Sequence, residues 1–414
     1  MNILMCNKFY FPRGGTERYL FSICKGLENL GHRILTFSMR NKNNLDSEFS
    51  GYFIEEIDLS KKLQVRDIFE FRKILNFIYS FPAKSKIEQL IKKYSPDVAH
   101  LHNIYHHISS SIIHPLKKNN IATVMTLHDY NLICPNYSLF SGLKLCERCK
   151  KTNFYEAVIN KCVKNSRLAS LLACFEMYFC RISRIYENQI DMFIAPSRFL
   201  QNKYIEFGID RKKIVFLPHA IDLKHFSPHF EPGQYILYFG DIQYRKGVHL
   251  LLTIAKHFKH VPLKIIGSGL QEKFMREVVS KDNLTNVEFL GYKSEENLAE
   301  SIANALFVIV PSLWHEVAGL AIYEAFASGK CVVAAHRGGI PEIVRNDING
   351  ILFDPEDEQG LLAKIRELMD NQGRIEELGR NGFESIKSIN DPTKHHQMLE
   401  SIYADAIKKH KKGS

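Results

Sequence analysis

A chain of 414 residues is long enough to bury two hydrophobic cores, and its 45% hydrophobic and 24% charged residues exclude a disordered or fibrous protein. No apolar run could span a bilayer, because Glu176 interrupts the longest one, and residues 2–6 are too short for a secretory signal, so we expect a cytoplasmic protein. The formal net charge of +10 lies entirely in residues 1–195, which hold 27 of the 55 Lys and Arg but only 17 of the 45 Asp and Glu.

This uneven positive charge has several interpretations. It could face nucleic acid, an anionic membrane, a phosphorylated acceptor or simply water. No motif of basic and aromatic residues typical of nucleic-acid binding is present, so we expect no nucleic-acid partner. The segment at 166–184, SRLASLLACFEMYFCRISR, carries apolar and basic residues together, which favours peripheral contact with an anionic membrane.

The first half of the chain alternates strand and helix patterns. Short apolar runs rich in β-branched residues predict strands, and the segment 16–30 predicts a helix after a loop at Gly14 and Gly15. The predicted strands are 2–6, 33–38, 97–102, 122–128, 191–197 and 213–219.

A second alternating series starts at residue 235. Its predicted strands are 235–240, 263–269, 287–292, 306–312, 331–335 and 350–353, and the stretch from Asp391 predicts a helix with a basic tail. The polar, proline-containing segment before the series predicts a linker. We therefore expect an N-terminal domain at 1–222, a linker at 223–233, a C-terminal domain at 234–390 and a helix at 391–414 that packs back toward the N-terminal domain. Two doubly wound α/β domains would enclose a cleft suited to a nucleotide and a second substrate.

Polar residues follow several of the predicted strands, where ligands bind in parallel sheets. In the first domain these are Gly14 and Gly15 in the first loop, His102 at the end of one strand, and His128 with Asp129 at the end of another. The two glycines lack the remaining residues of a dinucleotide fingerprint, so NAD is not expected. The histidines could equally be structural core residues.

The second domain offers charged and glycine-rich loops at the same strand ends. Arg245 and Lys246 lie in the segment 240–247 and could hold a diphosphate, or lie in a solvated turn. Gly267 and Gly269 follow the next strand, where glycine lets a ligand approach closely.

Two glutamates eight positions apart, Glu316 and Glu324, lie in the segment PSLWHEVAGLAIYEAFASGK at 311–330. The segment predicts a loop followed by a helix over 319–328 between two buried strands, with the unpaired backbone N–H groups of Ala318, Gly319 and Leu320 forming an anion site. The alternative is that both carboxylates are ordinary surface residues.

Four of the nine cysteines cluster at Cys134, Cys146, Cys149 and Cys162. A structural zinc site and buried free thiols are both compatible with this spacing, and disulfides are disfavoured in the cytoplasm.

Taken together, these motifs resemble a known family. The stretches FYFPRGGTERYL, SPDVAHLHN, TLHDY, KIVFLPHAIDLKHFSP, IIGSG, VEFLGY and PSLWHEVAGLAIYEAFASGK follow, over nearly the whole chain, the order of the family-4 retaining glycosyltransferases of the GT-B fold.

The resemblance implies a role for each matching residue. Glu324 would hold the ribose of a nucleotide-sugar donor and Glu316 the donor sugar, while the amides at 318–320 would face sugar and phosphate. Lys246 would hold the donor diphosphate and His128 would position sugar and acceptor. Residues 291–292, including Tyr292, would face the base. The family usually has an arginine where this chain has Asp241, so Arg245 would have to substitute for it.

The resemblance therefore implies a retaining hexosyltransferase that uses a UDP-, GDP- or ADP-sugar and needs no metal for its chemistry. Its acceptor would be a glycan or a lipid-linked molecule in cell-surface polysaccharide synthesis, at the inner face of the cell membrane. Two alternatives remain at this point: a nucleotide- or sugar-binding protein without turnover, and a GT-B nucleotide-sugar epimerase.

Overall fold

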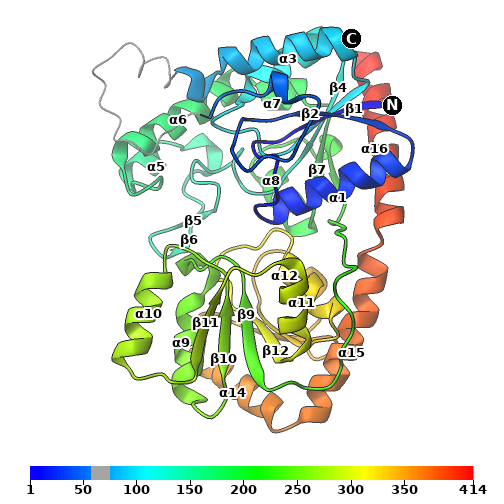
Figure 1. Ribbon diagram of the computed structural model, residues 1–414. Helices are drawn as coiled ribbons and strands as arrows, with labels where there is room; N and C mark the ends of the chain where they lie inside the picture. Colours follow the sequence, from blue (N-terminus) through cyan, green and yellow to red (C-terminus); the bar gives the residue numbers. More distant parts are fainter. Residues whose placement is uncertain (57–74, 414) are drawn as a thin grey trace. The chain divides into compact units, whose positions relative to one another are not determined.

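The computed structural model describes residues 1–56 and 75–413 and divides the chain into two compact units (Figure 1). The first unit contains residues 1–139, 147–221 and 392–414, and the second contains residues 140–146 and 222–391. Each unit is described by itself below.

The first unit is built on a parallel six-stranded sheet whose strand order is β2-β1-β3-β4-β7-β8. Its strands consist almost wholly of buried residues, as expected when helices cover both faces of a parallel sheet. Chain order reverses between β1 and β3, so this sheet is doubly wound, with its switch point at their carboxyl ends. The strands are β1 (Asn2–Cys6), β2 (Arg33–Phe37), β3 (Val98–Leu101), β4 (Ala122–Thr126), β7 (Met192–Ala195) and β8 (Ile214–Phe216).

Several helices of the first unit begin at serines that cap the backbone. The side chains of Ser80, Ser166 and Ser197 accept hydrogen bonds from the N–H groups three residues later. The helices of this unit are α1 (Gly15–Asn29), α3 (Phe81–Tyr94), α4 (Ile113–Lys118), α5 (Glu156–Ile159), α6 (Arg167–Ile182), α7 (Ile185–Gln189), α8 (Arg198–Glu206) and α16 (Pro392–Gly413), with short 3-10 turns at Ser50–Tyr52, Ser110–Ile112, Lys150–Thr152 and Arg211–Lys213.

The second unit has a parallel six-stranded sheet with the order β11-β10-β9-β12-β13-β14, the doubly wound order of nucleotide-binding folds. Its strands are β9 (Tyr235–Phe239), β10 (Leu263–Ile266), β11 (Val287–Gly291), β12 (Ala305–Val310), β13 (Val332–Ala335) and β14 (Ile351–Phe353), and a small hairpin, β5 (Phe140–Ser141) with β6 (Lys144–Leu145), is grouped with this unit. Its helices are α9 (Val248–His257), α10 (Glu272–Lys281), α11 (Glu295–Ala303), α12 (Leu320–Ala327), α13 (Ile340–Ile343), α14 (Glu358–Met369) and α15 (Gln372–Ile389), with a 3-10 turn at Tyr244–Lys246.

Each strand predicted from the sequence is present, usually one to three residues shorter than its apolar run because the last residues turn into the following loop. The predicted first helix and the helix near residue 320 are present as α1 and α12. Among the described residues, no helix has both the length and the hydropathy needed to cross a bilayer.

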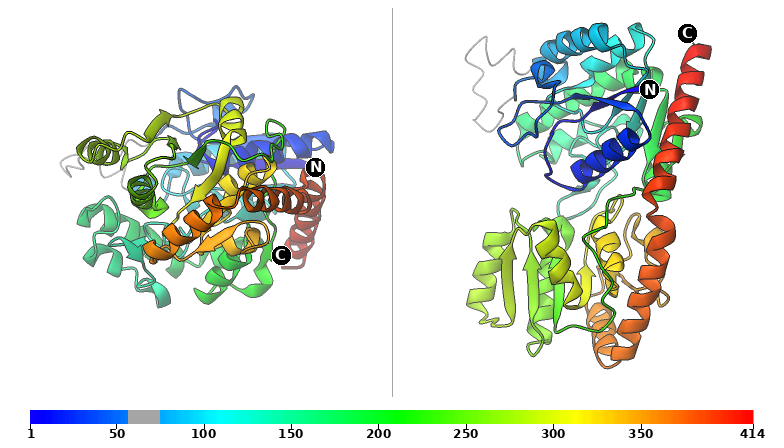
Figure 2. Two further views of the ribbon diagram at one scale, coloured as in Figure 1. Left: turned by 90° about the horizontal axis from the view of Figure 1, so that it is seen from below. Right: turned by 45° about the vertical axis from the view of Figure 1, so that its right-hand side comes forward.

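Helix α16 completes the core of the first unit, although it follows the whole second unit in sequence. It packs against α1 and β4, and the right-hand view of Figure 2 shows its red ribbon beside the blue ribbon of α1. Leu399, Tyr403 and Ala406 lie in the same buried cluster as strand residues from β1 and β4. The hydroxyl of Tyr403 lies 2.8 Å from Nδ1 of His100 on β3. The last helix is therefore an integral part of this unit.

The contact between α1 and α16 leads to the first testable prediction. Alanine in place of a helical glycine ordinarily stabilises a helix by about 1 kcal/mol. In Gly26→Ala, however, the new Cβ would lie 1.9 Å from Cε1 of the buried His396 ring. We expect urea denaturation to show a loss of about 1–3 kcal/mol, because the ring must be displaced from a packed site.

Gly373→Ala in α15 is the matched control, since its nearest neighbour would be Asn371 Oδ1 at 3.6 Å. It should be neutral or slightly stabilising. Equal stability of the two variants would show that α16 is not held at this contact.

Candidate active site

The switch point of the second sheet lies where β9 and β12 end side by side. Two loops leave it, residues 240–247 after β9 and residues 311–319 after β12. The carbonyl oxygen of Arg245 accepts hydrogen bonds from the N–H groups of Leu313 and Trp314 at 2.9 and 3.2 Å. Gly247 has a φ of +73°, and a Cβ there would lie 1.7 Å from the Pro311 carbonyl oxygen. The two loops are thus locked together through their backbones.

Glu316 occupies the centre of this pair of loops. Its carboxylate is only 7% exposed and lies 2.6 Å from Nζ of Lys246 and 2.5 Å from Oγ of Ser312. Burial alone would raise the pKa of Glu316, but the Lys246 charge and hydrogen bonds from Lys246, Ser312 and Trp314 outweigh it and lower the pKa. The carboxylate is therefore ionised and held in one place.

The backbone of Glu316 is fixed from behind by a glycine pair that the sequence did not identify as part of a site. The N–H of Gly339 donates to the Glu316 carbonyl oxygen at 2.7 Å. Gly338 has a φ of +59°, and a Cβ there would lie 2.4 Å from the same oxygen. The motif GGIPEIV was visible in the sequence, but its contact partner was not.

Arg245 lies beside the ion pair and is oriented by its neighbours. Its guanidinium carbon is 4.1 Å from the centre of the Trp314 ring, and its Nε donates to Gln243 Oε1 at 2.9 Å. Asp241 Oδ2 is 3.8 Å from the guanidinium, so the carboxylate that replaces the family's arginine contacts Arg245 itself. Two cations, Arg245 and Lys246, thus face Trp314 on one loop.

Glu324 lies in α12, five residues into the helix from its start at Leu320, and is 3% exposed. The suggestion that Glu316 and Glu324 are ordinary surface carboxylates is therefore wrong. Helix α12 begins at Gly319, which has a φ of +59° and provides no side-chain cap. Residues 318–320 are partly exposed, so the positive end of the helix dipole can reach a ligand.

The glycines after β10 have a packing role within the second unit. Gly267 has a φ of +129°, and a Cβ there would lie 2.0 Å from the Gly240 carbonyl oxygen. A Cβ on Gly269 would lie 2.4 Å from the Ile242 carbonyl oxygen. Both glycines therefore let the loop after β9 settle against the loop after β10. Tyr292, which follows β11, is 80% exposed and leaves its ring available for stacking.

In the first unit, His102 and His128 follow β3 and β4 and meet at 2.9 Å between Nδ1 and Nε2. His219 lies 5.2 Å from His128 between ring centres and stacks on Tyr19 at 3.9 Å. Burial lowers the pKa of His128 to about 3 and that of His102 well below its ordinary value, so these rings are neutral. The sequence indicated two of these histidines as site residues but not that His219 joins them.

The neighbouring site candidates are placed at the same edge of the first sheet. Asp129 Oδ1 accepts from the Asn131 N–H at 2.8 Å, so it shapes the turn after β4. Gly14 precedes α1 and has extended backbone, and a Cβ there would meet only Glu17 Oε2, at 3.7 Å. Packing among the described residues therefore does not require glycine at position 14. Gly15 is the first residue of α1.

The prediction of structural zinc is not supported. In residues 1–56 and 75–413, no three His, Cys, Asp or Glu side chains form a group that could hold a metal ion. Cys149 is buried in a small core with Phe154 and Cys174, and Cys162 packs against this cluster. The Cys134 thiol donates to Asn136 Oδ1 at 2.9 Å, and Cys146 is a free thiol of intermediate exposure. These thiols act mainly as small hydrophobic side chains.

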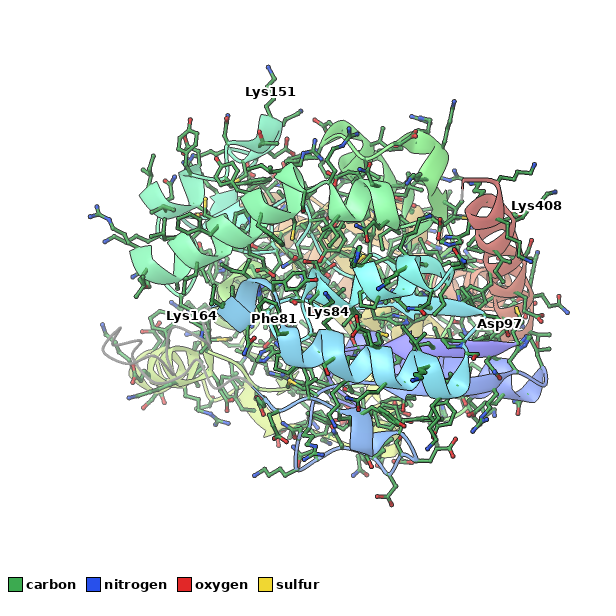
Figure 3. All side chains as sticks on the ribbon, turned by 90° about the horizontal axis from the view of Figure 1, so that it is seen from above. Phe81, Lys84, Asp97, Lys151, Lys164 and Lys408 are labelled. Carbon is green, nitrogen blue, oxygen red and sulfur yellow. The ribbon has the colours of Figure 1, made fainter. Side chains whose placement is uncertain are left out.

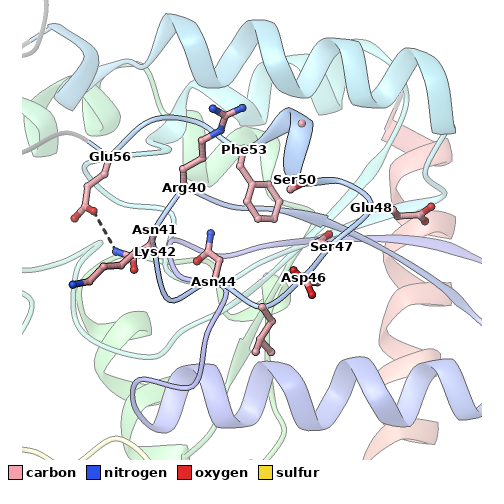
Figure 4. A pocket seen from close by; sticks show the side chains of 12 residues that line it. Arg40, Asn41, Lys42, Asn44, Asp46, Ser47, Glu48, Ser50, Phe53 and Glu56 are labelled. Carbon is pink, nitrogen blue, oxygen red and sulfur yellow. Dashed lines mark hydrogen bonds between the residues drawn. The ribbon is translucent and has the colours of Figure 1, made fainter.

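An open cavity of about 1050 Å³ is not formed by any of these candidates. It lies in the first unit between the end of β2 and the turn at Ser50–Tyr52 (Figure 4). Its walls are mostly polar side chains, including Arg40, Asn44, Asp46, Glu48 and Glu56.

The glycine contacts give a second prediction. Gly267→Ala combines an unfavourable φ with a clash against the Gly240 carbonyl, whereas Gly291→Ala has a φ of +66° and no described atom within 4 Å of its Cβ. Both variants should lose about 1–2 kcal/mol from backbone strain. Gly267→Ala should lose about 1–3 kcal/mol more in chemical denaturation. Equal losses would mean that the loop after β9 is free to move away.

Comparison with known proteins agrees with this geometry. Residues 13–225 match the model of Glycosyltransferase Family 4, and residues 221–385 match that of Glycosyl transferases group 1. An uncharacterized glycosyltransferase of Methanocaldococcus jannaschii is 24% identical over 94% of both chains. An uncharacterized 42.6 kDa protein in the cps region of Klebsiella pneumoniae is 24% identical over 83% of this chain and 88% of its own.

The fold is also that of solved glycosyltransferases, such as one from Rickettsia africae, which superposes with a TM-score of 0.68 at 18% identity over 98% of both chains. The structure of Anabaena Alr3699/HepE in complex with UDP-glucose superposes with a TM-score of 0.67 at 18% identity, covering 98% of this chain and 100% of that one. The expected fold class, α/β with two doubly wound Rossmann-like domains of the GT-B type, is confirmed. With matches that together extend from residue 13 to residue 385, the chain belongs to the family-4 glycosyltransferases.

Proposed function

We propose that the protein is a retaining hexosyltransferase that moves a sugar from a nucleotide-sugar donor to a glycan or lipid-linked acceptor in cell-surface polysaccharide synthesis. The observation that carries the proposal is the ion pair between the half-buried Lys246 and the buried Glu316 at the switch point of the second sheet, in front of helix α12, which carries the buried Glu324. The relative from the Klebsiella cps region and the structure with bound UDP-glucose support the same process and donor class.

The donor diphosphate would bind at the positive charges of this site. Lys246, Arg245 and the N-terminus of α12 would stabilise the negative charge that develops on the leaving diphosphate. These groups supply the charge that a divalent cation supplies in other transferases, so we propose metal-independent chemistry. When the diphosphate arrives, it competes with Glu316 for Lys246, which frees the carboxylate to accept hydrogen bonds from the sugar hydroxyls.

Glu324 would hold the ribose hydroxyls from within α12, and the backbone at 291–292 would face the base beside Tyr292. His128 would position the donor sugar and the acceptor hydroxyl. Because no covalent nucleophile is evident, the acceptor would attack from the face that the diphosphate leaves, with the leaving phosphate taking its proton. Release of nucleoside diphosphate only in the presence of acceptor would distinguish a transferase from a binding protein or an epimerase.

The two glutamates provide a prediction that separates their roles. Glu324→Gln should weaken binding of the nucleoside diphosphate by about tenfold to 150-fold, because a hydrogen bond to a charged group is worth about 1.5–3 kcal/mol. Glu316→Gln should lower kcat while leaving diphosphate affinity nearly unchanged, since it acts on the sugar and leaves Lys246 free for phosphate. Calorimetric titration with UDP, GDP and ADP measures the diphosphate affinity, and steady-state kinetics measures kcat.

Glu367→Gln on the exposed side of α14 is the matched control and should change neither quantity. If Glu324→Gln binds the preferred diphosphate as tightly as the wild type, the assignment of Glu324 to the ribose is wrong.

A second part of the proposal concerns the membrane. Helix α6 buries one side against the first unit and exposes an apolar stripe on the other, with Phe175 55% exposed and Ile182 81% exposed. The stripe follows helical spacing and consists of Leu168, Leu171, Phe175, Phe179 and Ile182. Tyr155, which precedes α5, and Ile159, its last residue, are exposed as well. An apolar surface of this kind on a soluble unit marks an interaction site.

Positive charge around the stripe favours an anionic bilayer as its partner. Lys161, Lys164 and Arg167 precede or begin α6, and Arg184 follows it, all of them exposed. Apolar insertion with flanking cations is the pattern of helices that lie in the interface of an anionic bilayer. We therefore propose peripheral attachment to the inner face of the cell membrane through α6.

The membrane prediction uses a double variant, Phe175→Ser with Ile182→Ser. Since a fully buried apolar side chain contributes about 1.5–3 kcal/mol, partitioning onto phosphatidylglycerol-containing vesicles should weaken by at least about tenfold. Leu270→Ser with Phe274→Ser, which removes equally exposed apolar groups from the second unit, is the control and should have no effect. Equal partitioning of the wild type onto neutral and anionic vesicles at low salt would contradict the proposal.

A further inference from the structure

Three polar side chains meet on one side of the loop that follows β9 in the second unit. Asp241 and Gln243 lie on either side of Ile242, which is fully buried. Gln243 has extended backbone, with a φ of −126° and a ψ of 151°, so the side chains at 241 and 243 face the same side, away from Ile242. The 3-10 turn at Tyr244–Lys246 then brings Arg245 back to this side, where it bonds to Gln243.

Hydrogen bonds join these three side chains in one direction. Nε2 of Gln243 donates to Asp241 Oδ2 at 2.5 Å, and Nε of Arg245 donates to Gln243 Oε1 at 2.9 Å. Because a carboxylate only accepts and a guanidinium only donates, a single orientation of the Gln243 amide satisfies both neighbours. The hydroxyl of Tyr238, which is buried in β9, donates to the Asp241 carbonyl oxygen at 2.7 Å and holds the acidic end in place. The three residues thus form an Asp241–Gln243–Arg245 relay.

The relay leaves the outer edge of the Arg245 guanidinium available to a ligand. Only one of its N–H donors, that on Nε, is used by Gln243. Among the residues that the structure describes, no acceptor lies within hydrogen-bond distance of either Nη atom, and Asp241 Oδ2 is 3.8 Å from Nη2. The Trp314 ring, whose centre is 4.1 Å from the guanidinium carbon, restrains the plane of the group. The two Nη atoms therefore keep the paired donors that suit a phosphate.

Asp241 is a negative charge beside the loop at which the donor diphosphate would bind. A carboxylate that paired directly with both Nη atoms would compete with phosphate, whereas one bonded through Gln243 does not. We propose that Asp241 and Gln243 are positioning residues that turn the Nη edge of Arg245 toward the donor diphosphate. The assignment rests on the proposed transferase function, and it accounts for how Arg245 takes the role of the arginine that the family usually has at position 241.

The first experiment is calorimetric titration of the full chain with UDP, GDP and ADP. Arg245→Gln should weaken binding of the preferred diphosphate by at least about tenfold, because charge-assisted contacts are lost. Gln243→Met, which keeps the length of the side chain but neither hydrogen bond, should weaken it by about threefold to tenfold. In the Arg245→Gln background, Gln243→Met should have no further effect, since Gln243 acts only through Arg245. Unchanged affinity in Gln243→Met, or a further loss in the double variant, would overturn the proposal.

Two controls separate the relay from general effects of substitution and charge. Gln359→Met changes an exposed glutamine in the first turn of α14 and should leave the affinity unchanged. Lys408→Gln removes a cation from α16, where the side chain projects into solvent (Figure 3), and should also leave it unchanged. A loss in Lys408→Gln equal to that in Arg245→Gln would reduce the effect to net charge and overturn the proposal.

The second experiment uses Asp241→Ala, for which two explanations predict opposite signs. If Asp241 were only a surface charge, its removal would strengthen binding of a diphosphate anion. In the relay, its removal lets the Gln243 amide rotate and Arg245 lose its orientation, so affinity should fall by about threefold to tenfold. Asp241→Asn keeps an acceptor for Gln243 and should restore the affinity. Unchanged or tighter binding in Asp241→Ala, or an equal loss in Asp241→Asn, would overturn the proposal. Failure of the transferase function itself is recognised separately, by a wild type that binds none of the three diphosphates, and that result would overturn both proposals.

Discussion

A buried carboxylate and the ammonium group that neutralises it determine how the candidate donor site is built. Glu316 is ionised in its buried position because Lys246, at 2.6 Å, together with hydrogen bonds from Ser312 and Trp314, outweighs the cost of burial. To bring the two side chains together, the loops after β9 and β12 must touch, which is why Gly247 and Gly338 are placed against carbonyl oxygens. The geometry of both loops thus follows from one ion pair.

In the first unit, neutral side chains rather than an ion pair bring the ends of the strands together. Its strand ends meet in a cluster of neutral imidazoles, His100, His102, His128 and His219, that bond to one another or to hydroxyl groups or stack on Tyr19. Neutral rings can be packed closely, whereas protonated ones would repel. The strand ends of the first unit therefore pack through neutral rings, whereas those of the second unit pack around an ion pair.

The sequence was sufficient for the fold class because buried parallel strands are continuous apolar runs, and those at 2–6 and 306–312 are too short for a typical helix. The Glu316–Glu324 spacing was informative because the two residues lie in a loop and helix that follow one buried strand and precede another. In a parallel sheet, such a loop and helix start lie at the carboxyl edge of the sheet. Contacts between distant segments, such as that of Gly338 with Glu316, were not predictable. Cysteine spacing also misled, since a thiol packed among Phe154 and Met177 has the same sequence signature as a metal ligand.

The position of α16 has a consequence for how the chain folds. The second unit is almost contiguous in sequence, since it consists of residues 222–391 and the hairpin at 140–146. All of its residues are therefore present as soon as residue 391 has been synthesised. The first unit is not complete at that point, because the core around Ile3 and Val124 stays open until Leu399 and Tyr403 arrive. During synthesis, apolar surface on the earliest strands therefore stays exposed to solvent while more than 150 later residues are added. Exposed apolar surface favours aggregation, so in this nascent chain the risk lies with its beginning rather than its end.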